Sequence, residues 1–135
     1  MNTQKYIPLV ARTFIALIFL QSAIGKITDF PGLVDTIAGK GLPLAFVMAA
    51  GTIAFQLLGS ISLILGYKAK WGALLLILFL IPATIVFHNF IADPSQKIAF
   101  LKNLGLMGGA LMVIAYGSGP LSLEPQAKTG LSEAE

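Results

Sequence analysis

The longest uncharged stretch of the chain runs from residue 41 to residue 67 and reads GLPLAFVMAAGTIAFQLLGSISLILGY, 27 residues. An α-helix rises about 1.5 Å per residue, so roughly 20 apolar residues cross the hydrocarbon core of a bilayer. An ionised side chain deep in that core costs several kcal/mol, which is why long uncharged runs mark spanning segments. This stretch therefore predicts a transmembrane helix at about residues 43–66.

Three further segments on either side of it have the same character. Uncharged runs of 22 and 21 residues predict helices at about residues 71–92 and 103–123. A segment at about residues 7–25 is as long, but it contains Arg12, which lies near enough to one end for its guanidinium to reach the headgroups. The expected fold is all-α: an integral membrane four-helix bundle at residues 1–123, followed by a polar, disordered tail at 124–135.

Composition supports a membrane protein and excludes several chemistries. Of the 135 residues, 56% are hydrophobic and 11% charged, less than half the roughly 25% of a soluble domain. The chain has no cysteine, which excludes disulfides, iron–sulfur clusters and a thiolate nucleophile. One histidine cannot supply a typical catalytic zinc site, so no metal is expected. The nine Lys and Arg residues are scattered, and nucleic acid is not an expected partner.

The link between the first two spans, residues 26–43, predicts a short interfacial helix. Apolar residues recur there at i, i+3, i+4 and i+7: Phe30, Leu33, Val34 and Ile37. Asp29, followed by a proline, is the expected N-cap. One apolar face beside a polar one is typical of a helix lying on the membrane surface.

The N-terminal segment has a competing interpretation as a secretory signal peptide, with Lys5 and Arg12 in its basic region. The polar residues that follow, Gln21, Ser22 and Lys26, favour a retained helix. With four spans both termini lie on one side, together with the short hairpin that carries Lys68 and Lys70. Excess positive charge marks cytoplasmic loops, so we expect both termini in the cytoplasm and the chain in the cytoplasmic (inner) membrane.

Polar residues gather at the opposite, non-cytoplasmic ends of the helices. This polar layer consists of Lys26, Asp29, His88, Lys102 and Asn103. Lysine and asparagine donors with one histidine as proton carrier suit an anionic or quinone-like head group. The alternative is purely structural: the lysines snorkel, Asn103 caps its helix, and Lys26 pairs with Asp29.

Two polar residues lie deeper in the predicted spans, Arg12 in the first and Gln56 in the second. An arginine that faces the bundle needs a partner, and an amide oxygen is one candidate. They form a candidate intramembrane polar pair, and the alternative is a snorkelling arginine beside an unrelated interhelical hydrogen bond of Gln56.

A GxxxG motif in the last span, Gly105 and Gly109, predicts a helix-packing face. Small residues at this spacing let two helix backbones approach closely in a membrane.

The stretch ARTFIALIFLQSAIGKITDF resembles the opening of DoxX family membrane proteins. The resemblance continues, in order, through GKGLP, LLGSISLILGYKAKWGA, FHNF and FLKNLGLMGGALMV. It implies a four-helix protein of the bacterial cytoplasmic membrane. The family name comes from a link to a thiosulfate:quinone oxidoreductase, and some members are associated with complexes that handle oxidative stress. The chain departs from the expected pattern at Gln56, where many relatives would have an acidic residue.

Two functions are consistent with these residues. The first is an accessory subunit of a membrane redox (quinone-linked) or oxidative-stress complex, in which quinone contacts the polar layer and any bound cofactor belongs to a partner. The second is a non-enzymatic scaffold or assembly factor that acts by helix packing. Both imply contact with membrane lipid and with other membrane subunits or further copies of the chain, and neither requires an autonomous catalytic set.

Overall fold

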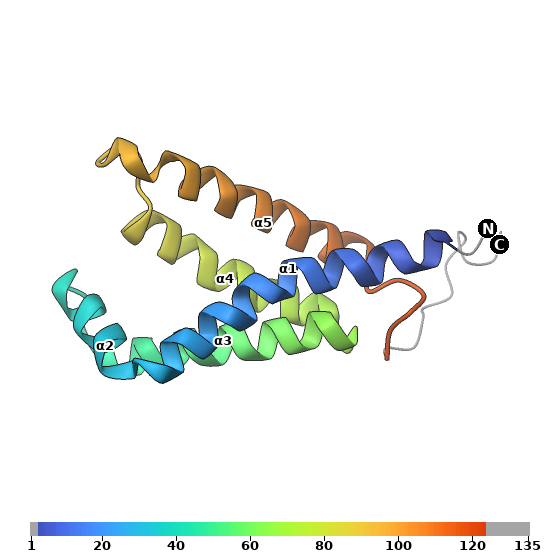
Figure 1. Ribbon diagram of the computed structural model, residues 1–135, viewed down its shortest axis with the longest axis horizontal. Coiled ribbons are helices and arrows are strands. Elements are labelled where there is room, and N and C mark those ends of the chain that lie inside the picture. Colours follow the sequence, from blue (N-terminus) through green and yellow to red (C-terminus); the bar gives the residue numbers. More distant parts are fainter. Residues whose placement is uncertain (1–2, 124–135) are drawn as a thin grey trace.

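The computed structural model describes residues 3–123, which form a bundle of long helices (Figure 1). Within this range four helices are long and apolar enough to cross a membrane, the last of them extended by the 3-10 turn η1 (Pro94–Gln96). They are α1 (Thr3–Thr28), α3 (Ala45–Leu65), α4 (Ala69–Phe87) and α5 (Lys97–Tyr116). The all-α membrane bundle predicted from the sequence is therefore confirmed, whereas the predicted tail at 124–135 lies outside the described residues.

The ends of the last two spanning helices differ from the expected ones. α4 ends at Phe87 rather than near residue 92, and α5 covers Lys97–Tyr116 rather than 103–123. An uncharged run marks the part of a segment that lies in hydrocarbon, but the helix itself ends where its backbone hydrogen bonding ends. Two lysines are tolerated in the first turns of α5, and Gly117, at φ +81°, ends it.

α2 (Phe30–Gly39) is the expected short helix between the first two spans. Asp29 caps it, because its carboxylate accepts a hydrogen bond from the Gly32 backbone N–H at 3.3 Å. Ile37 is the buried residue of α2, which packs against α3, and the Phe30 ring meets the Phe46 ring of α3 edge to face at 5.2 Å. These contacts attach α2 to the start of α3.

α3 is the central helix of the bundle, packing against α1 on one side and α4 on the other. α5 packs along α4 and contacts α1 over a shorter length. In Figure 1 α1 and α5 lie close near the chain ends and diverge toward α2. The core between the helices is small and largely aliphatic: Ala16, Phe19, Leu63, Ala69, Ala73, Leu76, Leu80, Ala110 and Val113.

α3 and α4 cross closely at two glycines that were not among the packing residues predicted from the sequence. A Cβ on Gly59 would lie 2.9 Å from the Gly72 carbonyl oxygen and 2.7 Å from the Leu76 side chain. A Cβ on Gly72 would overlap the Ser62 side chain. Only glycine at both positions allows these two backbones to approach so closely.

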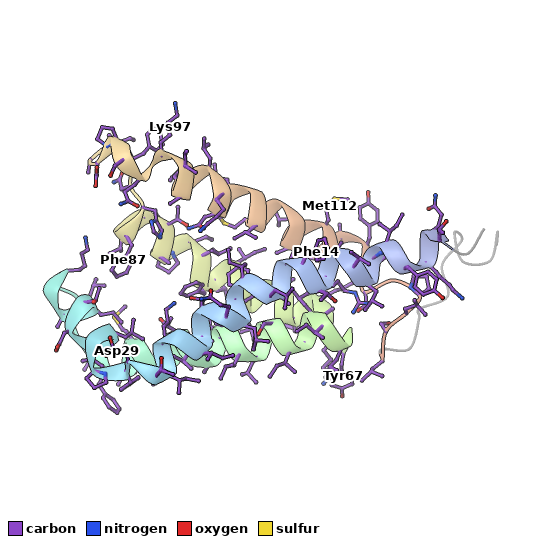
Figure 2. All side chains as sticks on the ribbon, viewed as in Figure 1. Phe14, Asp29, Tyr67, Phe87, Lys97 and Met112 are labelled. Atoms are coloured by element: carbon purple, nitrogen blue, oxygen red, sulfur yellow. The ribbon has the colours of Figure 1, made fainter. Side chains whose placement is uncertain are left out.

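The bundle has two different ends. The terminal end holds the start of α1, the α3–α4 turn and residues 117–123, and the α2 end holds α2 and the α4–α5 link (Figure 1). Figure 2 shows Tyr67 at the terminal end and Asp29 and Phe87 at the α2 end. At the terminal end the chain folds back over α3, where the Leu123 backbone N–H donates to the Leu65 carbonyl at 3.0 Å.

Candidate functional site

All four spanning helices line a cavity of about 140 Å³ near the α2 end. Its polar lining comes from Ser22, Lys26, Gln56, His88, Lys102 and Asn103. Its apolar lining comes from Ile18, Phe19, Phe79, Leu80, Ala83 and Leu106. Four members of the predicted polar layer thus line one cavity, and the fifth, Asp29, does not.

Lys26 points into the bundle rather than along its surface. Its ammonium group donates a hydrogen bond to the Ser22 hydroxyl one turn earlier on α1. The same nitrogen lies 5.8 Å from the centroid of the Phe79 ring on α4, a cation–π contact. The alternative in which Lys26 pairs with Asp29 is wrong, because Lys26 bonds to Ser22 and Asp29 caps α2.

Gln56 belongs to the same cluster. Its side chain is 1% exposed, and its Nε2 donates to the Ser22 hydroxyl at 3.2 Å. Ser22 therefore links Lys26 on α1 to Gln56 on α3. The Gln56 Oε1 is buried without a hydrogen-bond partner among residues 3–123. Burying an oxygen without a hydrogen-bond donor costs free energy. The cluster therefore retains an acceptor that can still take a hydrogen bond.

Asn103 is a buried residue that joins two helices, with 6% of its surface exposed. Its Nδ2 donates to the Thr84 hydroxyl of α4 at 3.0 Å. The alternative in which Asn103 caps its helix is wrong, because α5 begins at Lys97 and residue 103 lies in its second turn.

His88 follows the last residue of α4, where its ring is held by the link to α5. The His88 Nδ1 lies 2.8 Å from the Gln96 Oε1, so the Gln96 amide holds the imidazole ring through a hydrogen bond. Gln96 belongs to η1, whose N-cap is Asp93. Hydrogen bonds from Ser95 hold the pKa of the Asp93 carboxyl below its usual range. Gln96 is not among the residues predicted from the sequence, because it lies outside the predicted spans.

The electrostatic character of the cavity follows from its lining. Lys26 and Lys102 bring positive charge, and no Asp or Glu is among the described residues that line it. Such a site favours a ligand rich in hydrogen-bond acceptors or carrying negative charge. The apolar residues along its deeper wall favour a ligand with an apolar body.

A second, open groove of about 450 Å³ lies between α1 and α2. It is lined by Ser22 and Lys26 and by Gln21, Gly25, Asp29, Gly32, Leu33 and Thr36. Ser22 and Lys26 line the inner cavity as well, so they form the wall between the two spaces.

Arg12 lies at the other end of the bundle and does not pair with Gln56. Its side chain is 1% exposed; Nη1 donates to the Leu63 carbonyl at 2.8 Å and Nη2 to the Leu121 carbonyl. Gln56 is instead level with Ser22, ten residues further along α1, or about 15 Å at ~1.5 Å per residue. The predicted Arg12–Gln56 pair and the snorkelling arginine are both wrong, because backbone carbonyls of the terminal end receive the guanidinium.

The GxxxG motif of α5 is divided between the inside and the outside of the bundle. A Cβ on Gly109 would lie 2.8 Å from Cδ1 of Ile15, so Gly109 is where α5 approaches α1. A Cβ on Gly105 would have no atom within 4 Å. Within this chain only the second glycine of the motif serves helix packing.

The sequence model of the DoxX family matches residues 7–89. The chain belongs to the DoxX family. The match spans α1 to α4, including Arg12, Lys26, Gln56 and His88, while Lys102 and Asn103 of α5 follow it. The family resemblance seen in the sequence motifs is therefore confirmed.

Two relatives of this DoxX protein in Escherichia coli K12 are similar over most of their length. Inner membrane protein YqjF is 28% identical over 116 residues, covering 86% of this chain and 88% of YqjF. Inner membrane protein YphA is 26% identical over 138 residues, covering 92% of this chain and 99% of YphA. With its four apolar helices, the chain is a multi-pass inner membrane protein.

A third relative is much longer than this chain. The ER-derived vesicles protein ERV29 of Saccharomyces cerevisiae is 33% identical over 82 residues, which are 57% of this chain and 26% of ERV29. No solved structure matches this DoxX protein significantly.

Proposed function

We propose that this DoxX protein is an accessory subunit of a membrane redox or oxidative-stress complex, and that its polar cavity takes the head group of a quinone. The observation that supports this most strongly is the convergence of Lys26 of α1, Gln56 of α3 and His88 at the end of α4 on one cavity with apolar walls. The chain has no cysteine and one histidine. An electron-carrying cofactor would therefore belong to a partner subunit.

The size of the cavity fits the ring of such a head group. An apolar protein cavity of about 150 Å³ holds one benzene molecule, and this cavity measures about 140 Å³. A quinone also presents carbonyl oxygens, which need hydrogen-bond donors when they leave water. The volume and the donors together favour a ring with acceptor oxygens over a purely apolar ligand.

Lys26 and His88 would have different roles toward that ligand. An ammonium group has three N–H donors, and Ser22 accepts one of them, which leaves donors for a carbonyl oxygen. His88 is held by Gln96 through Nδ1, and an imidazole can both accept and donate a proton, so His88 is suited to exchange a proton with the ligand. We further propose that both termini are cytoplasmic, since Lys68 and Lys70 lie in the hairpin at the terminal end.

Binding in lipid nanodiscs tests the proposal directly. The native protein is titrated with a short-tailed quinone, and Lys26→Met is compared with Lys97→Met. Lys97 is at the same end of the bundle but points away from it (Figure 2), so it is a matched control. We expect Lys26→Met to raise the dissociation constant at least tenfold and Lys97→Met to leave it unchanged. Absence of quinone binding to the native protein would refute the proposal.

The redox role needs its own readout in the native complex. We expect His88→Ala to lower quinone-dependent turnover of the co-purified complex without lowering the amount of protein in the membrane. Unchanged turnover would remove His88 from the reaction and leave only a binding role for the cavity.

The scaffold function stays as a second candidate because Gly105 lies on the exposed side of α5 with open space around it. A helix of another subunit could approach the backbone closely at that point. Gly105→Leu should then release a co-purifying partner while the isolated protein stays folded. Gly109→Leu is a poor test, because its side chain would collide with Ile15 inside the bundle.

A further inference from the structure

We infer that the cavity opens sideways into the bilayer between α1 and α5, and that its ligand is an amphiphile with a one-ring head group and an apolar tail. This inference rests on the proposed function in one respect, namely that the cavity is a ligand site. It adds the route of entry and the size of the head group.

The route follows from how the helices pack. α5 is held along α4, whereas its contact with α1 is short and includes the point where Gly109 approaches Ile15. Toward the α2 end the two helices diverge (Figure 1). The cavity occupies this interval, with Ser22 and Lys26 of α1 among its lining on one side and residues of α5 on the other. Among the pairs of spanning helices that contact each other, α1 and α5 therefore have the smallest interface, and it lies beside the cavity.

The cavity is graded from polar to apolar along the membrane normal. Lys26 and His88 lie where α1 and α4 approach the α2 end, and Ile18 and Leu80 lie eight residues deeper on the same helices. Eight residues correspond to about 12 Å at ~1.5 Å per residue. A ligand with its polar head toward the α2 end and its apolar tail toward the bilayer centre matches this gradient. A wholly water-soluble anion would leave the apolar wall unused.

From the volume of the cavity we expect a limit on the size of the head group. About 140 Å³ is close to the volume that holds a single benzene ring, so a fused two-ring head exceeds it. The Phe19 and Phe79 rings lie edge to face at 6.4 Å and form one wall. The neighbouring wall includes Leu106, whose side chain can be shortened to enlarge the space.

The entry route can be measured without any ligand, because the chain has no native cysteine. A nitroxide is attached at Leu106→Cys, and its collisions with oxygen and with a water-soluble nickel chelate are compared by electron paramagnetic resonance in nanodiscs. Met112→Cys, on the exposed side of α5, is the lipid reference, and Asp35→Cys on α2 is the aqueous reference. We expect the Leu106 label to resemble the Met112 label. A nickel response like that at residue 35 would overturn the sideways route.

The head-group limit is tested with two quinones that carry the same ten-carbon tail, one with a single ring and one with two fused rings. We expect the one-ring compound to bind at least tenfold more tightly, and Leu106→Ala to bring the two-ring compound within threefold of it. Ala83→Leu, which fills the cavity instead, should weaken both and serves as the second variant. Equal binding of both compounds to the native protein would overturn the one-ring limit alone. Binding of neither would overturn the ligand class and, with it, the proposed function.

Discussion

Arg12 is the residue whose replacement most directly tests the packing of the terminal end. Its guanidinium donates to the Leu63 and Leu121 carbonyls, and the side chain is buried. A hydrogen bond from a charged donor contributes about 1.5–3 kcal/mol, so the two bonds together set an upper bound of about 3–6 kcal/mol. The cost of burying the guanidinium, whose Nε has no partner among residues 3–123, is subtracted from this bound. We expect Arg12→Met, which keeps the length of the side chain but donates nothing, to lower the free energy of unfolding by more than about 1 kcal/mol and by less than this bound.

The measurement is reversible unfolding in mixed micelles, followed by the fluorescence of Trp71, the single tryptophan of the chain. Arg12→Lys should lie between the native protein and Arg12→Met, because an ammonium group cannot reproduce the fork of the guanidinium. Lys5→Met removes a cation from the same helix and is the control. A change below 1 kcal/mol for Arg12→Met would mean that the guanidinium reaches the headgroups in the membrane, and the argument from its carbonyl partners would fail.

Four further outcomes are expected. Gly59→Leu should cost about 1–3 kcal/mol of unfolding free energy through overpacking of α3 against α4, and a stability equal to the native protein would contradict that crossing. Asn103→Leu should cost only about 0.6 kcal/mol, typical of an interhelical hydrogen bond in a membrane, in the same unfolding assay. Because the pKa of Asp93 is lowered in the folded state, its cap of η1 is complete above the unfolded pKa and is lost as the pH falls through the folded one. Amide exchange at η1, corrected for the intrinsic pH dependence, should therefore become less protected in that acidic range, and Asp93→Asn should remove the effect. Lys68→Cys should react with an impermeant thiol reagent only from the cytoplasmic side, and labelling from the opposite side would reverse the proposed orientation.

Much of the fold could be predicted from local properties of the sequence. Hydrocarbon excludes charge, so uncharged runs located three of the spans, and an apolar segment with one arginine near its end located the first. The spacing of Phe30, Leu33, Val34 and Ile37 located α2. The same reasoning brought Lys26, His88 and Asn103 to one end of the bundle, because depth in a membrane depends only on the position along each helix. Family membership was also readable from the order of short motifs.

The tertiary structure alone determined which of these residues meet. Depth along a helix does not specify its rotation, so the sequence could not show that Gln56 faces Ser22 and that Arg12 faces the Leu63 carbonyl. The second partner of Arg12, the Leu121 carbonyl, is a backbone group that any residue would provide, so no side chain in the sequence identifies it. The α3–α4 crossing likewise depends on Gly59 meeting a glycine of the facing helix, a match between two segments that neither segment reveals by itself. The approximate positions and depths of the helices follow from the hydrophobicity of residues along the chain. The cavity and the burial of Arg12 depend on how the helices are rotated and on how residues 117–123 fold back over α3, and only packing in three dimensions determines both.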